Sequence, residues 1–74
     1  MTSNITVTPY RTTPDRLAYA YTNSFGAQVA TRTQDANGNW TVRLYTTATE
    51  HEDYYGVPDE RAERLCLDHA EAMS

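Results

Sequence analysis

Apolar and polar residues alternate along most of the first 45 positions, a pattern typical of β-strands that have one packed and one solvated face. Apolar, aromatic or β-branched side chains recur at every second position in residues 17–21, 25–31 and 40–44. Residues 5–8 form a shorter alternating run that Pro9 ends. Because proline cannot donate to a ladder, we expect this first strand at an edge of the sheet. The pattern predicts three to four antiparallel strands in chain order.

The strongest turn signal is the Asn37-Gly38 pair, which lies between two alternating runs. A tight hairpin needs positive φ angles, and asparagine and glycine adopt these readily. Gly26, near the start of the preceding run, predicts a β-bulge. The connections are short, so we expect a meander in which neighbours in sequence are neighbours in the sheet.

The pattern changes at Thr49. Thr49 and Glu52 have the spacing of a capping box, so we expect a short helical turn at about residues 50–55, ended by Gly56. Pro58 suits the start of a longer helix. One arc of that helix is apolar and is expected to pack on the sheet. Its members are Ala62, Leu65, Cys66, His69 and Met73.

Together these elements predict a single α+β domain over residues 1–74, an antiparallel three- to four-stranded β-meander packed by one C-terminal α-helix. A chain of this size buries only about 60% of the surface that its unfolded form exposes, so the core is small. In architecture, the expected order resembles the sheet-plus-helix arm-binding domains of phage integrases. That resemblance implies a sheet face that contacts DNA, which would require basic and aromatic residues there.

Composition narrows the class of protein. The single cysteine, Cys66, excludes an internal disulfide. The first residues lack a basic start followed by an apolar run, so we expect no signal peptide. No stretch reaches the roughly 20 apolar residues of a membrane span. We therefore expect a cytoplasmic protein that does not enter a membrane.

Charge is distributed unevenly along the chain, whose net charge is −4. Residues 1–49 hold four arginines and two acids, whereas residues 50–74 hold two arginines and eight acids. The first part is mildly basic and the last third strongly acidic. Such a field influences solubility and encounter with partners rather than the fold.

The residues that could support catalysis or metal binding lack the required arrangement. Cys66 and His69 share the apolar arc of the helix, whereas a reactive thiol needs a partly exposed, electropositive site. His51, Glu52, Asp53 and His69 do not have the spacing of a metal motif such as HExxH. The sequence therefore predicts no enzymatic activity, no metal and no cofactor.

Two features of the acidic third favour protein binding. Tyr54 and Tyr55 follow directly after acids, and Leu67 projects into the acidic arc of the helix. Aromatic and apolar anchors within a polar rim are typical of protein interfaces. The other interpretation is that one tyrosine packs on the sheet and Leu67 is a scattered surface residue. The predicted protein-binding residues are Glu50, Glu52, Asp53, Tyr54, Tyr55, Glu60, Glu63, Leu67 and Glu71.

We therefore expect a small acidic protein-binding module whose partner presents a basic surface. In size, charge and lack of lysine the chain resembles phage or mobile-element accessory proteins that act as inhibitors by occupying the nucleic-acid-binding surface of another protein. Direct binding of DNA or RNA by the sheet face is an alternative, although the negative net charge does not favour it. Its residues would be Gln28, Arg32, Arg43 and Tyr45. A homo-oligomer or virion component, joined through Leu67 or an edge strand, is a second alternative.

Overall fold

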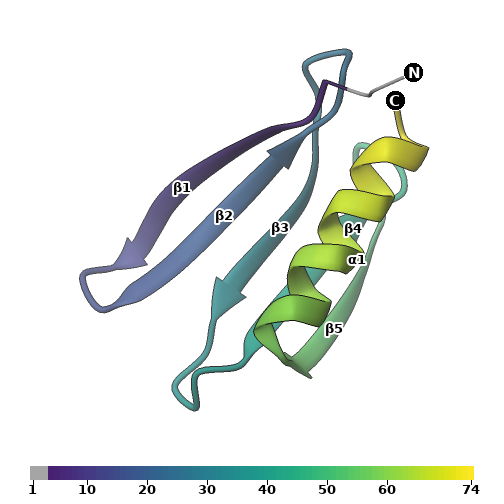
Figure 1. Cartoon of the computed structure of the whole chain (residues 1–74). Helices are drawn as coiled ribbons and strands as arrows, with labels where there is room; N and C mark the ends of the chain where they lie inside the picture. Colours follow the sequence, from purple (N-terminus) through teal and green to yellow (C-terminus); the bar gives the residue numbers. More distant parts are fainter. Residues whose placement is uncertain (1–3) are drawn as a thin grey trace.

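The computed structural model describes residues 4–74, which form five strands followed by one helix (Figure 1). The strands are β1 (Thr6–Thr13), β2 (Arg16–Thr22), β3 (Gln28–Gln34), β4 (Trp40–Tyr45) and β5 (His51–Val57), and the helix is α1 (Asp59–Ala72). Each strand pairs antiparallel with its neighbour in sequence, in the order β1-β2-β3-β4-β5. The α+β architecture is thus confirmed, with five strands in place of the three to four predicted.

Strand β1 lies at one edge of the sheet, but it continues through Pro9 instead of ending there. In an antiparallel sheet, successive residues direct their backbone groups alternately to the neighbouring strand and away from it. The Asp35 N–H donates to the Asn39 carbonyl at 2.8 Å, which fixes this alternation for the β3–β4 hairpin. When this alternation is traced through the residue pairs from β3 to β2 and from β2 to β1, the Pro9 nitrogen lies on the outer edge of the sheet. The missing N–H therefore costs no ladder bond.

Strand β5 replaces the short helical turn predicted at about residues 50–55. The preceding loop closes a hairpin, because the Thr46 N–H donates to the Glu50 carbonyl at 2.9 Å. The Thr47 hydroxyl accepts from the N–H of Glu50 at 3.0 Å, so it satisfies a backbone donor inside the loop. Gly56 has a φ of +64°, but it lies near the end of β5, where the register with β4 shifts, and not at a helix end.

Glycine also marks the connection between β2 and β3. Gly26 has a φ of +85° and lies in the turn, so the bulge predicted at this residue is wrong. The irregularity is nearby, where the register of β2 with β3 shifts between Tyr21 and Thr22. The positive φ explains why glycine is placed in the turn.

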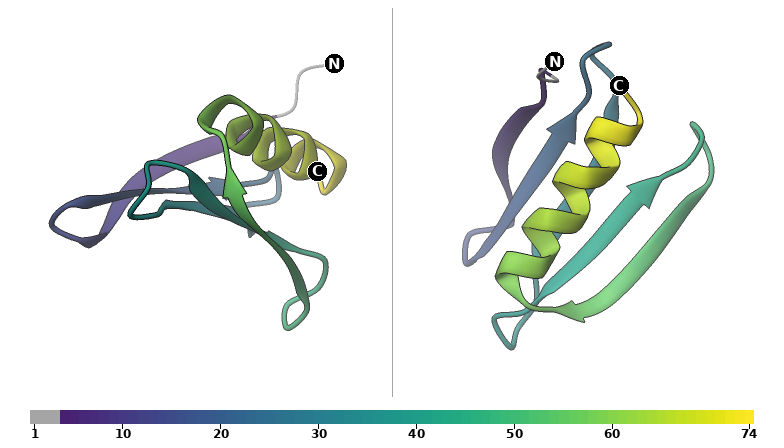
Figure 2. Two further views of the ribbon diagram at one scale, coloured as in Figure 1. Left: turned by 90° about the horizontal axis from the view of Figure 1, so that it is seen from below. Right: turned by 45° about the vertical axis from the view of Figure 1, so that its right-hand side comes forward.

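Helix α1 packs on one side of the sheet, chiefly over β3 and β4 with β2 beside them. Its fully buried residues are Ala62, Cys66 and Ala70, which are small and allow the helix to lie close to the strands. The predicted inward arc is confirmed for Ala62 and Cys66, whereas Met73 lies at the exposed end of the helix. Strand β5 extends beyond the helix on one side (Figure 2).

The buried side chains between sheet and helix form one cluster. Its members are Tyr21, Val29, Ala30, Trp40, Val42, Leu44, Val57, Ala62, Cys66 and Ala70. The alternation of Trp40, Val42 and Leu44 toward the helix is as the sequence predicted. Among residues 4–74, no helix combines the length and the apolar character needed to cross a membrane.

Candidate functional site

Strand β5 forms the sheet edge opposite β1, and its residues from His51 to Gly56 all remain at least partly exposed. Since α1 lies over the central strands, both faces of β5 and its outer edge reach solvent (Figure 2). Four of the nine predicted protein-binding residues lie on β5, and a fifth, Glu50, directly precedes it. The structure therefore gathers about half of the predicted set on one strand.

The two tyrosines of β5 point to opposite sides of the sheet, because successive side chains of a strand alternate between its faces. Tyr54 is paired with Val42, whose side chain is buried under the helix, so Tyr54 lies on the helix side. Tyr55 lies on the open face. Tyr54 is 40% exposed and Tyr55 is 74% exposed. Both reach solvent, yet a single flat surface cannot contact the two rings at once.

On the helix side of β5, Tyr54 is joined to an acid. Its hydroxyl donates to Glu52 Oε2 at 2.8 Å. This hydrogen bond, with the negative charge of Glu52, raises the pKa of Tyr54 above its usual value. The pair forms an anionic and aromatic patch next to the helix.

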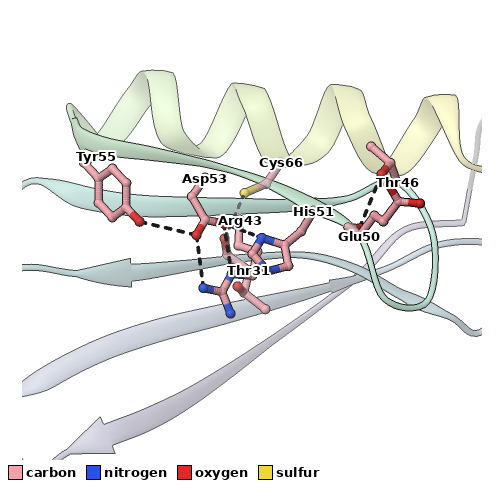
Figure 3. A network of polar contacts seen from close by, with 8 residues as sticks. All are labelled: Thr31, Arg43, Thr46, Glu50, His51, Asp53, Tyr55 and Cys66. Atoms are coloured by element: carbon pink, nitrogen blue, oxygen red, sulfur yellow. Dashed lines mark hydrogen bonds and ion pairs between the residues drawn. The ribbon is translucent and has the colours of Figure 1, made fainter.

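On the open face, Asp53 is the centre of a polar network (Figure 3). Arg43 donates to it twice, from Nε to Oδ1 at 3.0 Å and from Nη2 to Oδ2 at 3.1 Å. His51 Nδ1 lies 2.8 Å from Oδ1, and the Tyr55 hydroxyl donates to Oδ2 at 3.4 Å. The hydrogen bonds from Arg43 hold the pKa of Asp53 below its usual value and raise the pKa of Arg43. The positive charge of Arg43 therefore largely balances the negative charge of the Asp53 carboxylate.

The residues predicted to contact nucleic acid do not share one face. Arg43 and Tyr45 lie on the open face, but Arg32 is paired with Val42 and faces the helix, where it is buried. Gln28 is exposed at the start of β3. The prediction of Arg32 on the solvated face is therefore wrong, and the guanidinium of Arg43 is already occupied by Asp53.

Arg32 is held inside the molecule by a polar and aromatic cage. Its Nε donates to the Tyr21 hydroxyl at 2.9 Å and its Nη1 donates to Asp59 Oδ1 at 2.6 Å. The guanidinium carbon lies 4.5 Å from the centre of the Tyr19 ring and 4.3 Å from that of Trp40. Such cation–π contacts stabilise a desolvated arginine, so the role of Arg32 is structural.

The helix contributes the remaining predicted residues. Glu60, Glu63 and Glu71 are exposed. Leu67 is half-buried and packs against the core cluster, so it is not the free apolar anchor that the helical projection indicated. The physical reason is that the flank of the helix beside the sheet also excludes water. Arg64 lines a shallow pocket with Glu60, Glu63 and Leu67, which dilutes the negative charge of this face.

The two side chains considered for catalysis, Cys66 and His69, make their contacts inside the fold. Cys66 is fully buried, and burial raises the pKa of its thiol to about 12. His69 Nε2 lies 2.6 Å from the carbonyl oxygen of Tyr45. Within the part of the chain that the structure describes, no group of three His, Cys, Asp or Glu side chains is placed to hold a metal ion.

One exposed aromatic residue was assigned to a strand by the sequence pattern. Phe25 lies in the β2–β3 turn and is 79% exposed. Asn23 builds the turn: its Oδ1 accepts from the N–H of Phe25 at 3.0 Å and of Ala27 at 2.9 Å, and its Nδ2 donates to the Met73 carbonyl at 2.9 Å. The Asn23–Gly26 spacing was the available signal that the residues between them form a turn.

The side chains of β5 thus offer carboxylates and aromatic rings beside an open backbone edge. Their carboxylates either reach solvent or are paired, as for Asp53. Comparison with known proteins gives no relative from which a role could be transferred: no protein-family model, curated protein or solved structure matches the chain.

Proposed function

We propose that this chain is a non-enzymatic protein-binding module whose acidic side docks on a basic surface of a partner protein. The observation that carries this proposal is the exposure of β5, which places Glu52 and Tyr54 beyond the cover of the helix. An aromatic ring next to an exposed acid provides both contact area and charge. Enzymatic activity is not part of the proposal, because the thiol of Cys66 is buried and protonated.

The helix carries a second group of acids, on its flank toward β2 and apart from β5. Glu63 acts on Tyr21 of β2, whereas His69 on the opposite flank reaches the Tyr45 carbonyl of β4. Glu60, Glu63 and Glu71 are exposed on α1, on the same side of the sheet as Glu52. Carboxylates arranged in this way can substitute for phosphates on a surface that binds nucleic acid. The chain would then act as an inhibitor, as accessory proteins of phages and mobile elements do. Electrostatic complementarity of this kind mainly accelerates association and makes it sensitive to salt.

The alternative in which the sheet binds DNA or RNA is less well supported by the geometry. Of the two basic residues proposed for it, Arg32 is buried and Arg43 is paired with Asp53. Affinity for nucleic acid depends on free cations that displace counterions from the phosphates. We therefore rank this function second.

A binding assay with two probes distinguishes these functions. The probes are an immobilised oligo-arginine peptide and a DNA duplex, each measured at low and at physiological salt. We expect the protein to bind the peptide, with affinity that falls as salt rises, and to leave the duplex unbound. Binding of the duplex alone would instead support the second function.

A matched pair of variants tests whether the acidic side is responsible. Glu50→Gln with Glu52→Gln removes two negative charges from β5 and its loop. Gln28→Lys with Ala36→Lys adds the same positive charge at exposed positions elsewhere. We expect the first variant to bind the peptide about tenfold more weakly, and the second to lose much less. Equal losses would show an effect of net charge alone and would contradict the proposal.

A further inference from the structure

Strand β5 leaves one row of backbone groups without a neighbouring strand, and we propose that it accepts an extended segment of its partner as a sixth, antiparallel strand. The inference rests on the proposed function and adds the mode of binding and the chemistry of the partner. Strand addition to an exposed edge is a recurrent way of binding peptides, because the backbone supplies affinity and alternate side chains supply specificity.

The hydrogen-bond pattern identifies the free backbone groups. The Thr46 N–H donates to the Glu50 carbonyl. Because the direction alternates along a strand, Glu52 and Tyr54 also direct their backbone N–H and C=O groups to β4. The alternate residues, His51, Asp53 and Tyr55, direct their N–H and C=O groups outward. These three residues form the proposed acceptor edge.

Proline protects the other edge of the sheet but not this one. On β1, Pro9 lies at an outward-facing position and removes a donor from that edge. Proline and charge are the usual devices that prevent a free edge from pairing. No proline occurs between His51 and Val57. Charge is therefore what selects the strand that β5 accepts.

The charges on β5 specify an alternating pattern in that strand. Side chains of an added strand on the helix side would lie beside Glu52 and Tyr54, and opposite charges across strands attract. Arginine or lysine fits these positions. On the open face the added residues would meet His51, Asp53 and Tyr55. Because Asp53 is already paired with Arg43, neutral β-branched residues fit there. The partner segment thus carries basic residues at every second position.

A second copy of the chain fits this edge less well. Antiparallel pairing of two β5 strands centred on Asp53 sets the two Asp53 side chains opposite each other. Moving the register one step toward the preceding loop sets Glu52 opposite Glu52, whereas one step the other way sets Tyr54 opposite Tyr54. Like charges directly opposite are destabilising. A basic strand from a different protein has no such conflict.

The first arm of the test measures where a model strand binds. The probe is the blocked peptide Thr-Arg-Val-Arg-Thr-Arg-Val-Arg, added to the full chain labelled with ¹⁵N. We expect the amide resonances of His51, Asp53 and Tyr55 to shift and their hydrogen exchange to slow. Shifts confined to α1 would leave the proposed function in place and overturn strand addition. A peptide that does not bind at all would contradict both.

The second arm removes hydrogen-bond donors one at a time. In the antiparallel arrangement, the Thr and Val residues of the peptide direct their N–H groups to β5, whereas the Arg residues direct theirs away. We expect N-methylation of one central Val to weaken binding at least tenfold, and N-methylation of one central Arg to have little effect. Equal effects of the two modifications would overturn the inference.

The third arm uses the protein itself. His51→Pro removes an outward N–H without removing a bond to β4, in the way that Pro9 does on β1. His51→Thr removes the same imidazole but keeps the N–H. We expect His51→Pro to bind the peptide about tenfold more weakly than His51→Thr, with both variants folded by circular dichroism. Equal affinities, or light scattering that shows a dimer before peptide is added, would overturn the inference.

Discussion

The guanidinium of Arg32 donates to the carboxylate of Asp59 at 2.6 Å, which joins the middle of the sheet to the first turn of the helix. The two ends of this contact differ in environment, since the side chain of Arg32 is 8% exposed and that of Asp59 is 68% exposed. An acid in the first helical turn is also favoured by the helix dipole. In a chain too short for a large core, this arginine contributes contacts that apolar residues would otherwise supply.

Truncation of this arginine is expected to destabilise the fold. Arg32→Ala removes the contacts with the Tyr19 and Trp40 rings and the donor to the buried Tyr21 hydroxyl. We expect the free energy of unfolding, measured by urea denaturation, to fall by about 2–3 kcal/mol.

Two control variants divide this effect between charge and packing. Arg32→Met keeps an unbranched apolar stem between the rings and should cost less than Arg32→Ala. Asp59→Asn removes a charge only at the exposed end of the ion pair and keeps an oxygen that can accept from Arg32, so it should cost about 1 kcal/mol or less. If Asp59→Asn proved as destabilising as Arg32→Ala, the ion pair rather than the aromatic cage would hold the arginine.

Arg32 also shows where reading the sequence by residue type fails. Alternation correctly assigned Trp40, Val42 and Leu44 to the packed face of β4. Arginine is usually solvated, so the same reasoning placed Arg32 on the solvated face with Arg43. Only the pairing of strands reveals that Arg32 lies opposite Val42 and between two aromatic rings. Contacts between distant positions were needed, and a local pattern does not contain them.

Strand β5 was missed for a different reason. The helix from Asp59 was predicted because its apolar arc has a clear period, but β5 is open to solvent on both faces and shows no alternation. Its acidic residues are typical of the first turn of a helix, which favoured the wrong element. The loop before it closes through the Thr47 hydroxyl, without the asparagine or glycine that would mark a hairpin. An element that buries little leaves little trace in the hydrophobic pattern, although such an element is well suited to binding.

The network on the open face predicts an unusually acidic carboxyl group. Because Arg43 donates to both oxygens of Asp53, the ionised form is favoured and the pKa of Asp53 lies below the ordinary value for aspartate. The stabilisation from this carboxylate is present above the pKa of the unfolded chain and is lost as pH falls through the lower pKa of the folded state.

NMR titration of the Asp53 carboxyl carbon measures this directly. We expect Arg43→Gln to raise the pKa of Asp53 toward the ordinary value for aspartate. Arg61→Gln, which changes an exposed arginine on the helix, should leave it unchanged. A normal pKa for Asp53 in the unmodified protein would argue against the paired arrangement.

The thiol of Cys66 is expected to be unreactive while the chain is folded. Burial raises its pKa to about 12, so almost no thiolate exists at neutral or mildly alkaline pH, and the sulfur is inaccessible. Alkylation by iodoacetamide, followed by mass spectrometry, should therefore occur only through unfolding. Addition of urea should increase the rate in parallel with the unfolded fraction. Rapid alkylation of the folded protein would indicate a local opening between α1 and β3.

Asn23 and Phe25 occupy the same turn but are expected to respond oppositely to substitution. Asn23 is buried and connects the turn to the end of the helix, because its side chain bonds two backbone N–H groups and the Met73 carbonyl. Asn23→Ala leaves these groups without partners and should lower the free energy of unfolding by about 1–3 kcal/mol. Phe25→Ser removes a ring that contributes little to the core, and its effect should stay within about 0.5 kcal/mol.

Comparison of these two variants by thermal and urea unfolding tests whether the turn is a rigid part of the fold. Amide exchange of Ala27 should accelerate in Asn23→Ala and remain unchanged in Phe25→Ser, since only the former loses the acceptor at 2.9 Å. If Phe25→Ser were the more destabilising change, the ring would have to pack on the protein in solution. If instead only Asn23→Ala destabilises the protein, the side-chain hydrogen bonds of Asn23 alone explain why the turn is ordered. The exposed ring of Phe25 then contributes nothing to the conformation of the backbone that carries it.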